Sequence, residues 1–364
     1  MRRQTYRPYL FLGIFFIGIL NLPLGWTNGG RASIVSFASS FSIGSNGTST
    51  TPPELENLLI RKQNQTLRNR LLSEERVEHQ LEKLKSLEIL AEKKTEEFFK
   101  RRQHAAEALL SLELYSLFAQ VTYRSSASWN STLWINVGER DNTSLQEKIV
   151  AVNSPVLKGQ YLIGVVEYVG KTKSRVRLFT DSTLIPSVRV ARGGSKNREI
   201  LELLDILQEQ LSLRDETHEE LASLESLKQK LNQDLDERYL AKGELYGTSS
   251  PLWRGCSSTL KGIGFNYDFS DEEGPALELR SGKPLDRLST KEEVALIKKG
   301  DLLVTTGMDG VFPSDLPVAL VSSIEPLQEG AVAFEIEAKL CAGNLHNLRD
   351  VTVLPPLSFL EEAR

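Results

Sequence analysis

The spacing of apolar residues predicts a long helix in the first third of the chain. Residues 54–120 contain no Pro or Gly and consist largely of Leu, Glu, Lys, Arg and Gln, which favour helix. Apolar residues recur in steps of three, four or seven, as in a coiled coil: Val77, Leu81, Leu84, Ala91, Phe98, Ala105, Leu109 and Leu112. We therefore predict a coiled-coil helix over residues 54–120, about 100 Å long if continuous, with self-association along this seam. Glu88 and Arg102 interrupt the seam, so a helix that docks on its own β domain remains the alternative.

Two later stretches have the pattern of short β-strands. Residues 121–196 and 244–357 hold β-branched and apolar runs separated by Gly and Asp, which predicts two small β-barrel or sandwich lobes. In the second stretch, Val332, Phe334, Ile336 and Ala338 alternate with polar residues and are expected on one face. Residues 197–243 return to helical spacing and predict a helical insertion between the lobes. No Pro or Gly forces this insertion to bend into a hairpin, so its shape stays open.

The N-terminus has the pattern of a membrane anchor. Residues 10–20 form an unbroken apolar run, and Arg2, Arg3 and Arg7 precede it. This predicts one transmembrane helix within residues 1–26, with the N-terminus in the cytoplasm and the body outside. A cleaved signal peptide is the alternative, because the run is short for a full span. Residues 27–53, rich in Ser, Gly and Thr, predict a flexible spacer, and residues 358–364 a short tail.

Composition adds little to this picture. The 364 residues carry a formal net charge of −4, which does not favour a nucleic-acid-binding protein. Only two cysteines are present, Cys256 and Cys341, too few for a disulfide framework or a zinc site. Whether these two cysteines pair is left open by the sequence.

The sequence contains no recognisable catalytic, cofactor or metal motif. The pattern of Asp268, Ser270 and Glu272 is similar to a calcium loop, but the glycine that follows is displaced by one position, so a solvated acidic loop is the better interpretation. His218-Glu219 begins like a zinc helix, but position 222 is alanine. We therefore expect no cofactor, no metal and no enzymatic activity.

Two stretches of the β lobes carry a specific pattern of residues. These residues are Pro155, Val156, Gly164 and Asp181 in the first lobe, and Gly300, Asp301, Thr306, Gly307, Gly310, Val311, Phe312, Pro313, Pro317 and Val318 in the second. With this pattern the chain resembles MreC, the bacterial rod shape-determining family. The two glycines between Thr306 and Val311 permit left-handed backbone in a turn. Phe312 is interpreted as a core residue, with an exposed contact as the alternative. The chain departs from the family where Ser314-Asp315 replaces the usual Lys-Gly pair, and in its helical insertion.

The resemblance implies a scaffold of cell-wall synthesis with no chemistry of its own. Such a protein is expected in the inner membrane with its body in the periplasm. Its expected partners are a second copy of itself, a penicillin-binding transpeptidase, and MreD and MreB through the anchor region. An alternative function is a periplasmic adaptor of a secretion or efflux system, since such adaptors also combine an anchor, a coiled coil and β lobes. A membrane-anchored wall hydrolase, a third class, lacks the nucleophile or metal cluster that it needs.

Overall fold

The computed structural model describes residues 71, 75–85, 96–145, 147–212, 218–232, 238–248, 259–271, 273–285 and 293–359. The predicted anchor, the spacer, Cys256 and most of the tail lie outside these residues. Within the part of the chain that is described, no helix combines the length and apolar character needed to cross a membrane.

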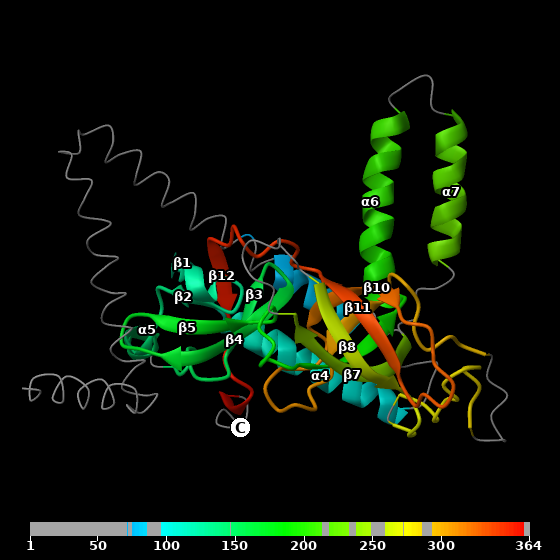
Figure 1. Ribbon diagram of the computed structural model, residues 1–364. Coiled ribbons are helices and arrows are strands. Elements are labelled where there is room, and N and C mark those ends of the chain that lie inside the picture. The colour runs from blue at the N-terminus through cyan, green and yellow to red at the C-terminus, as the bar shows by residue number, and fades with distance from the viewer. Residues whose placement is uncertain are drawn as a thin grey trace, which may run out of the picture.

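The body consists of two closed six-stranded barrels that lie side by side (Figure 1). All neighbouring strands are antiparallel. The first barrel has the strand order β1-β12-β3-β4-β5-β2 and the second β10-β11-β8-β7-β6-β9. The strands are β1 (Leu117–Tyr123), β2 (Thr132–Ile135), β3 (Pro155–Lys158), β4 (Tyr161–Val169), β5 (Ser174–Leu178), β6 (Ser187–Arg192), β7 (Arg238–Gly247), β8 (Thr259–Asn266), β9 (Leu302–Thr305), β10 (Pro317–Ile324), β11 (Phe334–Leu340) and β12 (Asp350–Val353). Two short helices, η1 (Ser126–Ser128) and α5 (Glu139–Leu145), lie in loops of the first barrel.

The second barrel, formed by β6 to β11, is inserted in the sequence between β5 and β12 of the first barrel. This differs from the division into residues 121–196 and 244–357 predicted from the sequence. β6 was placed in the first lobe, but it pairs with β7 and β9 in the second barrel. β12 was placed in the second lobe, but it pairs with β1 and β3 and closes the first barrel. Local patterning finds strands but carries no information about such distant partners. The alternation predicted for β11 is confirmed for Ile336 and Ala338, which are buried, whereas Val332 precedes the strand and is exposed.

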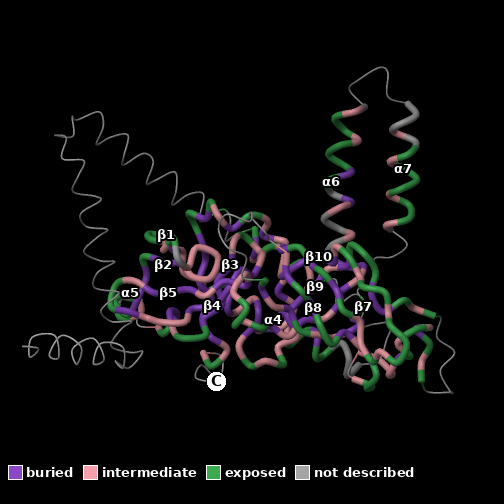
Figure 2. The backbone as a smooth tube through the Cα atoms, in the orientation of Figure 1, coloured by how far each residue is buried: buried purple, intermediate pink, exposed green. Residues whose placement is uncertain are grey.

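The predicted helical insertion contains an antiparallel hairpin of α6 (Gly194–Ser212) and α7 (His218–Asn232), but its predicted end is wrong, because residues 238–243 belong to β7. It connects β6 to β7, which are neighbours in the second barrel, so it does not link the two lobes as the sequence suggested. The hairpin projects away from the body, and its outer surface is largely exposed (Figures 1 and 2).

The predicted continuous helix over residues 54–120 is wrong in the part that the structure describes. Residues 75–85 form one helix and α4 (Glu96–Leu114) another, while the last residues of the predicted helix belong to β1. Arg76 Nη2 donates a hydrogen bond of 3.2 Å to Ser116 Oγ. A straight helix would separate two residues forty positions apart by about 60 Å. The chain must therefore reverse direction between the two helices.

The apolar seam of this region packs, at its C-terminal end, against the chain's own barrels. Leu109 belongs to the core, and Leu112 is fully buried. Val77, Leu84 and Ala105 are half-buried and Leu81 is exposed, while Ala91 and the side chain of Phe98 lie outside the described residues. Because Leu109 and Leu112 are covered within one chain, they cannot form the predicted contact with a second copy, and docking on the chain's own β domain, the alternative, applies here.

One connected group of buried apolar side chains runs through both barrels (Figure 2). It joins residues of the first barrel, such as Leu133 and Val353, to residues of the second, such as Val188 and Leu340, and it includes Leu109 of α4. The barrels and α4 therefore share one core, which fixes their relative position.

Candidate functional site

The turn between β9 and β10 is held by hydrogen bonds within its own motif residues. Asp309 Oδ1 accepts from the backbone N–H groups of Val311 and Phe312, both at 3.0 Å. Thr305 Oγ1 donates to the Pro313 carbonyl at 2.5 Å and accepts from the Leu316 N–H at 3.0 Å. The two glycines of this turn, at positions 307 and 310, have φ of 78° and 67°, which confirms the predicted left-handed backbone.

This turn also joins the second barrel to the first. Phe312 is 1% exposed, which confirms its interpretation as a core residue, and its ring meets that of Phe179 edge-on with centroids 5.4 Å apart. Within the second barrel, Thr306 Oγ1 lies 3.0 Å from Ser187 Oγ at the start of β6. Gly247 approaches the backbone of Thr180 so closely that an added Cβ would collide with it. Phe312 therefore lies inside the junction between the barrels, whereas Gly310 of the same turn is exposed.

The other motif residues also have structural roles. Asp301 accepts two hydrogen bonds from Arg192, at 2.9 and 2.6 Å, and thereby ties β9 to the end of β6. Gly164 lies against the carbonyl of Arg177 on β5, where no Cβ fits. Asp181 Oδ1 accepts from the N–H and the hydroxyl of Thr183 in a tight turn, at 2.7 and 2.6 Å. The remaining motif residues that are buried or half-buried are Pro155, Val156, Val311, Pro313, Pro317 and Val318, whereas Gly300 is exposed and has a φ of 89°.

Charged side chains of the N-terminal helices dock onto the second barrel around Tyr239. Arg102 of α4 lies over the Tyr239 ring at 4.3 Å, and Arg189 of β6 lies 4.7 Å from the centroid of the same ring. Arg102 also forms an ion pair of 2.6 Å with Glu273. The Tyr239 hydroxyl donates to Asp315 Oδ1 at 2.5 Å. Arg102, which interrupts the apolar seam in sequence, is thus a docking residue, and that interruption was the one sequence signal for this contact.

Asp315 connects the motif turn to the helix of residues 75–85. Its carboxylate pairs with Lys83 Nζ at 3.2 Å, and this cation holds the pKa of Asp315 below its ordinary value against the opposing effect of burial. Its φ of 69° is one that a side chain rarely adopts. The resemblance placed a usual glycine at this position. The aspartate that replaces it supplies the contact to Lys83, which sequence reasoning missed because Lys83 is more than two hundred residues away.

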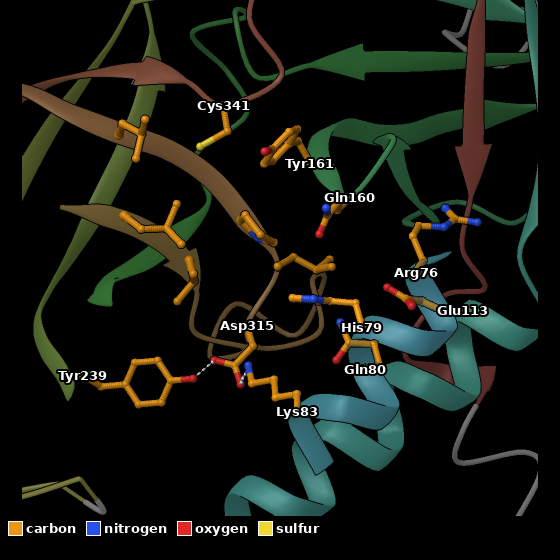
Figure 3. Close-up of a pocket in the computed structure, with 15 residues that line it drawn as sticks. Arg76, His79, Gln80, Lys83, Glu113, Gln160, Tyr161, Tyr239, Asp315 and Cys341 are labelled. Carbon is orange, nitrogen blue, oxygen red and sulfur yellow. Dashed lines mark hydrogen bonds and ion pairs between the residues drawn. The ribbon is translucent and has the colours of Figure 1, made fainter. Parts of the chain in front are cut away.

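A polar cavity lies where the two N-terminal helices and both barrels meet (Figure 3). Glu113 and Gln80 point toward it, and neither Glu113 Oε2 nor Gln80 Oε1 has a hydrogen-bond partner among the described residues. Burial raises the pKa of the Glu113 carboxyl to about 7 and lowers the pKa of the Arg76 guanidinium. The lining combines these polar groups with apolar side chains such as Leu302, Val304 and Leu320.

The acidic loop around Asp271 is used in ion pairs. Asp271 accepts a 2.6 Å hydrogen bond from the Tyr267 hydroxyl and pairs with Lys242 at 2.5 Å. Asp268 and Ser270 are exposed, and Glu272 lies outside the described residues. Across the residues that the structure describes, no group of three His, Cys, Asp or Glu side chains is arranged to hold a metal ion.

The comparisons with known proteins agree with this architecture. The family model "Rod shape-determining protein MreC, barrel core" matches residues 121–237 and 269–355. The chain belongs to the MreC family. The match covers most of the strands of both barrels, and it includes both stretches that carry the resemblance seen in the sequence.

Several solved MreC structures are similar to this chain. MreC from Pseudomonas aeruginosa is 20% identical, with 66% of this chain and 98% of that one covered and a TM-score of 0.38. MreC from Listeria monocytogenes is 18% identical, with 80% and 95% covered and a TM-score of 0.39. A complex between penicillin-binding protein PBP2 and MreC from Helicobacter pylori contains a chain that is 14% identical, with 66% and 98% covered and a TM-score of 0.32. No curated protein matches the chain.

Proposed function

We propose that this member of the MreC family is a non-enzymatic scaffold of peptidoglycan synthesis. In this proposal residues 1–26 anchor it in the inner membrane, and the two barrels lie in the periplasm. The observation that carries the proposal is the match of both barrels to the barrel core of a rod shape-determining family. The burial of motif residues such as Phe312 and Val318 supports it too, because these side chains belong to the core that joins the two barrels.

The proposed partners are a penicillin-binding transpeptidase on the periplasmic side, MreD and MreB through the anchor region, and further copies of the chain. The Helicobacter pylori MreC relative is in complex with PBP2, which supports the choice of a transpeptidase. A scaffold of this kind acts by tethering, because each weak contact gains from the local concentration that the other contacts create.

The adaptor function is not favoured. A periplasmic adaptor is expected to carry its coiled-coil hairpin between two halves of a lipoyl-like domain. Here the α6–α7 hairpin connects two adjacent strands of one closed barrel.

In-cell cross-linking of a tagged full-length chain tests the proposal. We expect a penicillin-binding transpeptidase, MreD and MreB among the cross-linked proteins. The matched control carries a cleavable signal peptide in place of residues 1–26, and should keep the transpeptidase but lose MreD and MreB. Recovery of a transporter or an outer-membrane channel without wall enzymes would overturn the proposal in favour of the adaptor.

A further inference from the structure

The α6–α7 hairpin has an apolar face that nothing in the described chain covers. Leu203, Ile206 and Leu207 are 66%, 55% and 44% exposed. Ile206 and Leu207 follow Leu203 by three and four positions, so the three residues lie on one side of α6. Leu201 and Leu204, by contrast, are buried. Three large apolar side chains grouped on a projecting element indicate a docking surface.

The side of α6 that faces α7 is already occupied. Lys228 of α7 forms an ion pair with Asp205 and donates a 3.2 Å hydrogen bond to Gln208 Oε1. Asp205 and Gln208 follow Leu201 and Leu204 at helical spacing and share their face. The Leu203 face therefore points away from α7, and a partner can reach it without opening the hairpin.

The distribution of charge along the hairpin favours a second copy in antiparallel orientation. Residues 209–212 and 218–220, where α6 ends and α7 begins, contain three acids and no Lys or Arg, whereas residues 194–198 and 228–232, at the opposite end of the hairpin, contain four bases and no acid. Two hairpins packed in the same direction bring acidic end to acidic end. Two hairpins packed in opposite directions bring the acidic end of each to the positively charged end of the other. These opposite charges attract over the roughly 10 Å range of charge interactions at ordinary salt.

The apolar positions fit the same arrangement. Consider an antiparallel pair whose two-fold axis passes at the level of position 205 along α6. Leu203 of each copy then lies opposite Leu207 of the other, and Ile206 lies close to the axis. Such a pairing is self-complementary, as the interface of a symmetric dimer must be. We propose that α6 is a homotypic docking surface, through which two copies of this chain associate antiparallel by Leu203, Ile206 and Leu207.

This proposal stands apart from the cell-wall role, because it follows from the α6–α7 hairpin alone. The Leu203 face is small compared with a stable interface, so the contact is weak by itself and gains from tethering of the copies. It also differs from the seam predicted for self-association, part of which the barrels cover.

Disulfide cross-linking of the full-length chain tests the proposal. In a background with Cys256→Ser and Cys341→Ser, two differently tagged copies are co-expressed, one with Leu203→Cys and the other with Leu207→Cys. The background must first show an unchanged circular dichroism spectrum. We expect more dimer from this mixture than from either variant alone, and a lower yield at high salt. Val332→Cys, which is 79% exposed on the second barrel, measures collisional cross-linking.

Two outcomes would overturn the proposal. One is a mixed pair that cross-links no better than the Val332→Cys control. The other is more dimer from either single variant than from the mixture, which indicates parallel packing. As a second readout, Ile206→Cys should cross-link to itself near the two-fold axis. Adding Leu203→Glu and Leu207→Glu should abolish that product, and adding Val332→Glu should leave it intact.

Discussion

The contact between the rings of Phe312 and Phe179 couples the stability of the two barrels. Replacing Phe312, which is 1% exposed, by alanine removes a buried aromatic side chain and leaves a cavity. A change of this kind costs about 3–5 kcal/mol. The edge-to-face geometry with Phe179 accounts for about 0.5–1.5 kcal/mol of that loss. We therefore expect Phe312→Ala to lower the free energy of unfolding by about 4 kcal/mol.

Urea unfolding, monitored by tryptophan fluorescence, measures this loss of stability and shows whether the first barrel is destabilised too. Trp134 lies in the first barrel, is 5% exposed and packs against Tyr168. In a background in which Trp26, Trp129 and Trp253 are replaced by Phe, its emission reports the unfolding of that barrel. Phe312 belongs to the second barrel. If the shared core makes the barrels one cooperative unit, the Trp134 transition shifts although the substitution is in the other barrel. Phe269→Ala is the matched control, because that side chain is 79% exposed.

Two results would refute this reasoning. A loss of less than about 1 kcal/mol would mean that the Phe312 ring is not packed as described. An unchanged Trp134 transition alongside a destabilised second barrel would mean that the barrels unfold independently. The double variant with Phe179→Ala separates the pair contact from the rest, with an expected coupling of about 0.5–1.5 kcal/mol.

Three further predictions concern a charge, an ion pair and a glycine. Burial raises the pKa of Glu113 from 4.5 to about 7, so between these pH values the folded chain holds a proton that the unfolded chain releases, and stability falls as pH rises. The Glu113→Gln variant should therefore have a higher melting temperature than the wild type at pH 8 and the same melting temperature at pH 4. Asp301→Ala leaves Arg192 without its buried partner and should cost about 3 kcal/mol in urea unfolding, and a near-neutral result would contradict the clamp between β6 and β9. Gly164→Ala should abolish soluble expression because the new Cβ meets a neighbouring strand, while Gly274→Ala, with its nearest neighbour at 3.6 Å, should express normally.

Much of the fold could be predicted from the sequence because its signals are local. Strand alternation, turn glycines and helical spacing located the β-rich stretches and the helical hairpin, although most of β1 and β7 fell in segments predicted as helix, and the motif from Gly300 to Val318 identified the family. The membership of β6 and β12 could not be predicted, because pairing with strands that are distant along the chain leaves no mark in a strand's own pattern. The reversal after residues 75–85 also escaped prediction, because no Pro or Gly occurs there and tertiary contacts decide the path.

The contacts at the candidate site show the same limit. Phe312 and the two turn glycines were predicted because residue type alone constrains them. The pairing of Asp315 with Lys83, and the stacking of Arg102 on Tyr239, join segments far apart in sequence. For Arg102 a signal existed, since a cation in an apolar seam needs a partner. The partner itself appears only once the chain is folded.

The return of β12 to the first barrel has a consequence for the order in which the chain folds. β5 ends at Leu178, and β12 begins at Asp350, so every strand of the second barrel is synthesised before the first barrel can close. Until then β1 and β3 present open edges, which invite pairing with other chains. We infer that the second barrel folds first, and that its closure brings β12 within reach and shortens the effective loop. A chain that stops before Asp350 would be left with an unclosed first barrel and a tendency to aggregate, even though it contains every strand of the second.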